Sequence, residues 1–124
     1  MLLALAVGAA GAVGAVARYL LDGAVQDRTS GLLPFGTLTV NVIGSLILGV
    51  AAGIALRASD AAATSMAIVG TGFCGGFTTW STVTWETVRL VEEGAAPLGV
   101  VTLAGGLVAC LLAAGSGLAL TAVA

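Results

Sequence analysis

The residues best suited to chemistry lie in one stretch, Val69–Glu86 (VGTGFCGGFTTWSTVTWE), inside an otherwise apolar chain. The stretch combines closely spaced glycines with six Thr or Ser hydroxyls. Glycine and β-branched Thr weaken a helix, and an unwound segment offers carbonyl groups to cations and N–H groups to anions. The alternative is a Gly-rich packing face whose hydroxyls bond to their own backbone. The density of hydroxyls favours an ion site.

Uncharged donors in this stretch favour an anion over a proton-coupled cation. A proton-coupled exporter usually needs a carboxylate deep in the membrane, whereas Glu86 stands at the end of the stretch with Arg89 one turn away. Trp80 lies among the hydroxyls and offers the positive edge of an aromatic ring to a small anion. A second polar position, Asn41, interrupts an earlier apolar segment. Its amide fits either an interhelical hydrogen bond or a donor facing a water-filled path.

Composition points to a membrane as the solvent of this chain. Of its 124 residues 59% are hydrophobic and 8% charged, against about a quarter charged in soluble domains. His is absent and only two Cys occur, Cys74 and Cys110, which argues against a multi-ligand metal site or a His-based catalytic site and favours a packing role for both thiols. A net charge of −2 provides no basic surface for nucleic acid.

Apolar runs predict four membrane spans within a single transmembrane domain, residues 1–124. A spanning helix needs roughly 20 mainly apolar residues, and such runs cover residues 2–21, 37–56, 64–90 and 97–122. We therefore expect an all-α membrane protein with four transmembrane helices. The third contains the Gly/Thr stretch and is expected to be broken near the bilayer midplane, where unwound backbone survives only inside protein or along a cavity.

The first span carries small residues at helical spacing. Gly8, Gly11 and Gly14 recur every third residue and form a smooth face for close helix packing. Arg18 follows near the helix end, where its head group can reach the interface or pair inside the bundle.

Arginine counts leave the orientation open. With four spans, one side of the membrane holds Arg57 and the other holds Arg28 and Arg89, so the positive-inside rule provides almost no bias. One interpretation is that a Lys-free sequence makes the rule uninformative. The other is dual topology, in which the chain inserts both ways and pairs antiparallel.

Three motifs resemble one family, the Fluc (CrcB-type) fluoride channels. Gly72–Val83, GFCGGFTTWSTV, is similar to the family signature GFCGGFTTFSTF and differs at two of twelve positions. Gly36–Gly49, GTLTVNVIGSLILG, resembles the second-helix motif, and Gly11–Tyr19, GAVGAVARY, resembles the first-helix motif. The resemblance extends over essentially the whole chain.

The resemblance implies an antiparallel dual-topology dimer in the cell membrane with two fluoride pores between the subunits. Fluoride would leave the cell passively and confer fluoride resistance, without any enzymatic step. The family binds a structural Na⁺ through backbone carbonyls, and the matching positions are Gly75 and Thr78. Pore positions map onto Asn41, Thr79, Trp80, Ser81, Thr82, Val83 and Glu86, of which Asn41, Ser81 and Thr82 would supply donors and Trp80 an aromatic edge.

Two departures from the family pattern leave the identity of the partner open. Trp80 and Val83 stand where the family has two Phe residues, and Val101 and Gly105 stand where Tyr and Ser are usual in the fourth helix. The chain is therefore either a self-sufficient homodimer or the non-conducting or partner half of a heterodimeric fluoride channel with a related subunit. A small multidrug transporter would need a membrane-embedded Glu in the first span, which contains none.

Overall fold

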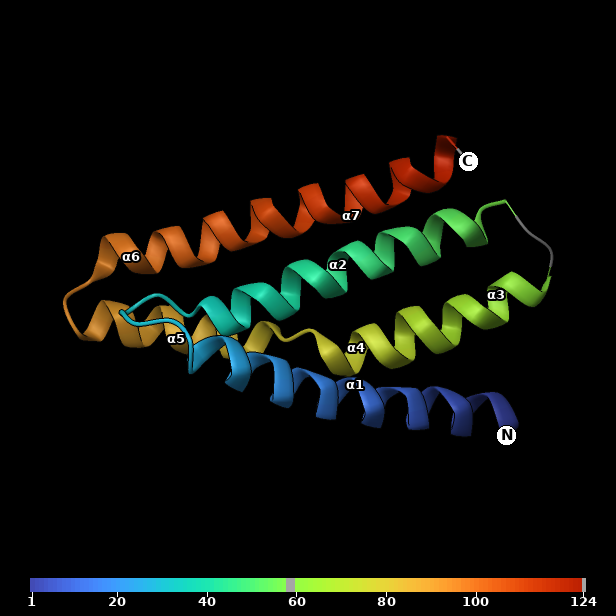
Figure 1. The fold of residues 1–124 in the computed structure, drawn as a ribbon, viewed down its shortest axis with the longest axis horizontal. Coiled ribbons are helices and arrows are strands. Elements are labelled where there is room, and N and C mark those ends of the chain that lie inside the picture. The colour runs from blue at the N-terminus through green and yellow to red at the C-terminus, as the bar shows by residue number, and fades with distance from the viewer. Residues whose placement is uncertain (58–59, 124) are drawn as a thin grey trace.

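The computed structural model describes residues 1–57 and 60–123, and all of its regular elements are helices. Three helical runs within those residues are long and apolar enough to cross a membrane: Leu2–Gln26, Phe35–Ala55 and Ala96–Thr121. A fourth passage, between the second and third of these runs, is built from several shorter helical pieces. Figure 1 shows the chain running along the bundle four times, with the N- and C-termini at the same end. The expected all-α membrane architecture is confirmed.

The bounds of the outer helices differ by a few residues from those expected. Helix α1 spans Leu2–Gln26 and α2 spans Phe35–Ala55, beginning after Pro34. The last passage comprises α6 (Ala96–Val100), a π-helical turn η2 (Val101–Gly105) and α7 (Gly106–Val123). Helix α1 therefore continues five residues beyond the expected end at Leu21, because apolar and small residues follow Asp22 before the chain turns.

The third passage is interrupted, as expected. It comprises α3 (Asp60–Met66), a π-helical segment η1 (Ala67–Cys74), the short α4 (Gly75–Phe77) and α5 (Trp80–Glu92). Thr78 and Thr79 between α4 and α5 have extended backbone, with ψ angles of 161° and 125°. The glycines of the stretch remain helical, Gly70 and Gly72 in the π-helical segment and Gly75 and Gly76 in α4, and the chain leaves the helix only at these two threonines.

Glycines permit the closest approaches between helices. A Cβ atom on Gly14 of α1 would overlap the Phe73 carbonyl, and one on Gly49 of α2 would overlap the Ala114 carbonyl of α7. Helix α1 packs against the interrupted helix, and α7 packs against α2 on the other side of the bundle (Figure 1). The interrupted helix and α2 thus form the centre, where Val40 and Cys74 are almost fully buried.

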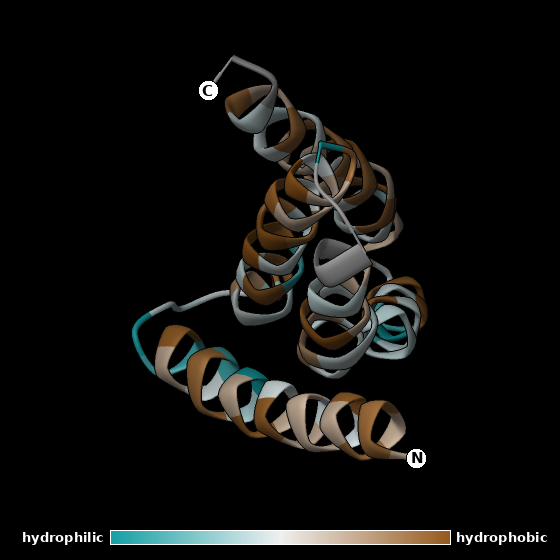
Figure 2. Ribbon diagram, turned by 90° about the vertical axis from the view of Figure 1, so that its right-hand side faces the viewer, coloured by the Kyte–Doolittle hydropathy of each residue, from teal (hydrophilic) through white to brown (hydrophobic). Residues whose placement is uncertain are grey.

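Hydrophobic residues cover the outside of the bundle, and hydrophilic colour in Figure 2 is limited to short segments. Large apolar side chains such as Leu111, Leu112 and Val13 are more than half exposed, which suits contact with lipid. Charged residues lie toward the helix ends: α1 has none before Arg18, and α2 and the run Ala96–Val123 have none at all. The structure is therefore that of a multi-pass membrane protein.

Candidate functional site

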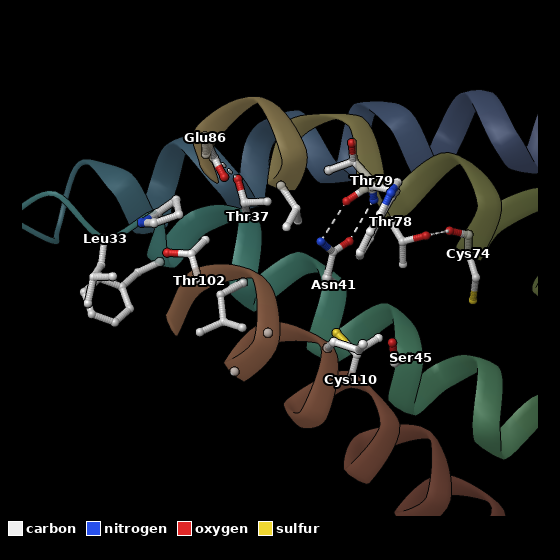
Figure 3. Close-up of a pocket in the computed structure, with 18 of the residues that line it drawn as sticks. Leu33, Thr37, Asn41, Ser45, Cys74, Thr78, Thr79, Glu86, Thr102 and Cys110 are labelled. Atoms are coloured by element: carbon white, nitrogen blue, oxygen red, sulfur yellow. Dashed lines mark hydrogen bonds between the residues drawn. The ribbon is translucent and has the colours of Figure 1, made fainter. Parts of the chain in front are cut away.

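The break between α4 and α5 is held open by a side chain from another helix. The Asn41 Nδ2 group donates to the Thr79 carbonyl at 2.9 Å, and the Thr79 N–H donates to Asn41 Oδ1 at 2.7 Å. The amide thus pairs with both backbone polar groups of one residue, as a neighbouring strand would (Figure 3). Both alternatives considered for Asn41 have support, because the amide makes an interhelical bond and also lines a cavity.

Thr79 caps the helix that follows the break. Its Oγ1 accepts a hydrogen bond from the Thr82 N–H at 3.2 Å, which is the usual role of Thr at a helix N-cap. The same oxygen lies 2.9 Å from Thr82 Oγ1 and 3.3 Å from Ser81 Oγ. Three of the hydroxyls singled out in the sequence therefore gather at the positive end of α5, where an anion is favoured.

Two carbonyls at the break lose their helical donors. In a continuous helix the Thr79 N–H would return to the Gly75 carbonyl and the Thr82 N–H to the Thr78 carbonyl. The first donates to Asn41 Oδ1 and the second to Thr79 Oγ1 instead. Gly75 and Thr78 are the two positions that the family resemblance assigns to Na⁺, and free carbonyls are the ligands such a hard cation prefers. The backbone at the break therefore fits the cation, although the assignment remains a prediction.

A cavity of about 510 Å³ opens beside the break, between α2, the interrupted helix and the last helical run (Figure 3). Most of the expected site residues line it: Asn41, Gly75, Thr78, Thr79, Trp80, Val83 and Glu86. Ser81 and Thr82 do not; they lie on the other side of Thr79, in the cap. The cavity wall is largely apolar, and its polar groups are mainly amides and hydroxyls.

Glu86 joins this cavity to a second one of about 520 Å³ near the loop that follows α1, because it lines both. The Thr37 hydroxyl of α2 donates to Glu86 Oε1 at 2.8 Å. The other carboxylate oxygen, Oε2, is buried without a hydrogen-bond partner among the described residues. The second cavity is also lined by Asp22 and Glu93; that Glu86 lies near a pore mouth stays a prediction.

The two positions that depart from the family signature have different environments. Val83 is buried, whereas the Trp80 side chain is 60% exposed at the edge of the cavity. One turn beyond, Trp85 is equally exposed, and the Arg89 guanidinium lies 5.5 Å from the centre of its ring. Arg89 also forms an ion pair with Glu93 at 2.8 Å. Trp80 and Phe35 are thus aromatic residues that line the cavity, and Val83 is a buried part of its wall.

The three glycines of α1 differ in how closely they pack against the rest of the chain. Gly14 is buried against Phe73, and a Cβ on Gly11 would lie 3.5 Å from the Gly72 carbonyl. A Cβ on Gly8 would meet nothing within 4 Å. Arg18 is partly exposed one turn beyond Gly14. Gly14 and Gly11 therefore pack α1 against the interrupted helix, while Gly8 faces outward.

Three polar residues that line the cavity were not among the expected site residues. Thr37 and Ser45 lie four residues before and after Asn41, so α2 presents a polar side chain on this wall at each turn. That spacing was the available signal. Thr102 is the third, and it projects from the π turn of the last helical run (Figure 3).

The fold and the site define a class: a small multi-pass membrane protein whose polar groups gather at a break in one transmembrane helix. The chain belongs to the family described as "CrcB-like protein, Camphor Resistance (CrcB)", which matches residues 5–118.

Relatives from bacteria and an archaeon are similar over most of their length. A protein of Frankia casuarinae named "Fluoride-specific ion channel FluC 1" is 45% identical over 116 residues, covering 90% of each chain. "Fluoride-specific ion channel FluC 2" of Cutibacterium acnes is 45% identical over 111 residues, again 90% of each. "Fluoride-specific ion channel FluC 2" of Haloarcula marismortui is 45% identical over 109 residues, 88% of this chain and 85% of the relative.

Proposed function

We propose that this protein is a fluoride-selective ion channel of the cell membrane, through which fluoride leaves the cell passively. The observation that carries the proposal is the Asn41–Thr79 pairing, which exposes uncharged donors at a helix N-terminus beside a cavity inside the bundle. The similar proteins named fluoride-specific ion channels supply the identity of the ion. The family's function is transport, and no covalent step is invoked.

Fluoride is small and strongly hydrated, so a selective pore must replace its water by closely spaced donors. In the proposed route the ion passes from the mouth near Glu86 to the break. Asn41 retains a second N–H on Nδ2, because an amide has two donors and one of them is bound to Thr79. Trp80 adds the positive edge of its ring. Ser81 and Thr82 do not line this cavity, so their hydroxyls would meet the ion only where the proposed route passes the cap of α5.

The proposed assembly is an antiparallel dimer of two copies of this chain in the lipid bilayer, inserted with dual topology. Few charges near the helix ends leave the insertion direction unbiased, which supports this arrangement. A structural Na⁺ is proposed at the Gly75 and Thr78 carbonyls, whose helical donors are diverted to other acceptors. A bound Na⁺ would supply only positive charge that holds the break together; the donors for fluoride come from the chain's own side chains.

The test is fluoride efflux from liposomes that contain only this purified chain, with chloride efflux as the control. Fast efflux of fluoride without chloride is the expected result. Equal efflux of both anions would contradict the fluoride assignment. Absence of efflux from a well-folded dimer would contradict the homodimer, and co-expression with a related subunit from the same genome would then decide whether the chain is half of a heterodimeric channel.

A further inference from the structure

The Thr102 hydroxyl differs from most other hydroxyls in the helices. Its Oγ1 atom is buried and forms no hydrogen bond with the described residues. Other helical Thr and Ser side chains return their hydroxyl to a carbonyl three or four residues earlier, as is common in apolar surroundings. Those that do so are Thr39, Thr78, Thr84, Thr87, Ser116 and Thr121. The Thr102 hydroxyl therefore keeps its proton available.

The backbone around Thr102 departs from an α-helix. Residues Val101–Gly105 form a π-helical turn, η2, within an otherwise α-helical run, and Thr102 is its second residue. A π turn is wider than an α turn, and such turns occur frequently at functional sites. Thr102 therefore combines an unusual backbone with a hydroxyl that has no hydrogen-bond partner among the described residues.

The position of Thr102 places this donor on the wall of the cavity at the helix break. Figure 3 shows it on the last helical run, while Thr37 and Asn41 come from α2 and Glu86 from α5. Space remains on this wall because glycines follow. A Cβ on Gly105 would meet only Val101 Cγ1 at 3.9 Å. One on Gly106 would likewise meet only Leu38, at 3.8 Å.

A buried donor without an acceptor is costly, and a ligand that accepts a hydrogen bond removes that cost. A small anion in the cavity is such a ligand. Hydrogen-bonded atoms approach more closely than van der Waals contact allows, so a hydroxyl recessed in the wall can still reach it. We propose that Thr102 is a further fluoride-coordinating residue, which provides a hydroxyl donor from the last helical run to the cavity that Asn41 also lines. The inference rests on the proposed fluoride channel.

The test compares Thr102→Val, Thr102→Ser and Thr39→Val by fluoride efflux from liposomes and by thermal unfolding in detergent. Valine keeps the shape and removes the hydroxyl, serine keeps the hydroxyl, and Thr39 is the matched control because its hydroxyl already bonds to the Phe35 carbonyl at 2.7 Å. We expect Thr102→Val to lower fluoride efflux about tenfold, the effect of one hydrogen bond to an ion. Its unfolding midpoint should not fall, because the lost hydroxyl has no hydrogen-bond partner in the part of the chain that the structure describes. Serine should recover most of the efflux, and Thr39→Val should match the wild type.

The outcomes separate the two proposals. If the wild-type chain passes fluoride and Thr102→Val passes it equally well, the role of Thr102 is wrong and the channel assignment stands. If Thr102→Val lowers both the efflux and the unfolding midpoint, the hydroxyl has a structural partner and its role as an ion ligand is also wrong. If the wild-type chain passes no fluoride, either alone or with a related subunit from the same genome, the proposed channel fails, and the role of Thr102 fails with it.

Discussion

Asn41 and Thr79 lie 38 positions apart in the chain and form two hydrogen bonds, of 2.9 and 2.7 Å, between the side-chain amide of Asn41 and the backbone N–H and carbonyl of Thr79. The pairing takes the place of the helical bonds that Thr79 would otherwise make. It fixes both where the third passage leaves its helix and which backbone groups face the cavity.

Replacing Asn41 should therefore destabilise the protein as well as affect transport. Asn41→Ala leaves the N–H and the carbonyl of the nearly buried Thr79 without partners, at a cost of about 2 kcal/mol or more. A lower unfolding midpoint in detergent, together with loss of fluoride efflux, is the expected result. Thr39→Ala, on the same helix, is the control, and an unchanged midpoint for Asn41→Ala would show that the pairing does not hold the break.

Glycine substitutions on α1 should separate packing from helix propensity. Gly14→Ala places a Cβ against the Phe73 carbonyl and only 2.9 Å from the Phe77 nitrogen, whereas Gly8→Ala meets nothing within 4 Å. We expect Gly14→Ala to lower the unfolding free energy, since backbone atoms must move. Gly8→Ala should be neutral or raise it by up to about 1 kcal/mol, because Ala favours a helix. If Gly8→Ala is the more damaging of the two, Gly8 packs against a second subunit.

Thr37 and Glu86 should be energetically coupled. The Thr37 hydroxyl donates a hydrogen bond to Glu86 Oε1 at 2.8 Å. Hydrogen bonds to charged groups contribute about 1.5–3 kcal/mol to stability. Thr37→Val should cost stability in that range, and much less in a background that carries Glu86→Leu. A double-mutant cycle of unfolding free energies measures this coupling. Strictly additive effects would show that the bond contributes nothing.

The aromatic ring at position 80 should matter for transport more than its size suggests. Trp80→Ala is expected to lower fluoride efflux about two- to tenfold, the range of an aromatic edge interaction, and Trp80→Phe should preserve it. Trp85→Ala removes an equally exposed ring, 61% against 60%, that stacks on Arg89 and does not line the cavity at the break. Equal losses for Trp80→Ala and Trp85→Ala would indicate a general effect of surface tryptophans.

Removal of Na⁺ should lower the stability if the Gly75 and Thr78 carbonyls bind it. At a concentration one hundred times its dissociation constant, a ligand stabilises the folded state by about 2.7 kcal/mol. Purification in N-methyl-D-glucamine should therefore reduce the unfolding midpoint, and added Na⁺ should restore it more effectively than K⁺. Thermal unfolding curves that coincide in N-methyl-D-glucamine, Na⁺ and K⁺ would argue against the Na⁺ site.

Sequence patterns predicted the helices and the existence of the break, because length and hydropathy decide which segments cross a membrane and Gly/Thr runs weaken a helix. They did not predict where the break falls. The glycines stay helical, and the chain leaves the helix at Thr78 and Thr79. It does so because the side chain of Asn41, a residue distant in sequence, bonds to the N–H and the carbonyl of Thr79. The sequence also did not predict that the Thr102 hydroxyl is buried without a hydrogen-bond partner among the described residues. Thr102 lies in a π turn, and no pattern in the surrounding residues indicates that turn. The dimer and the Na⁺ stay predictions.

The distribution of charge has a further consequence for how the protein responds to voltage. A voltage sensor needs gating charges that move across the electric field, yet α2 and Ala96–Val123 contain no Asp, Glu, Lys or Arg, and α1 has none before Arg18. The membrane potential will act on the permeating ion and scarcely on the helices. Current through the protein should therefore rise smoothly with voltage, without a threshold for opening.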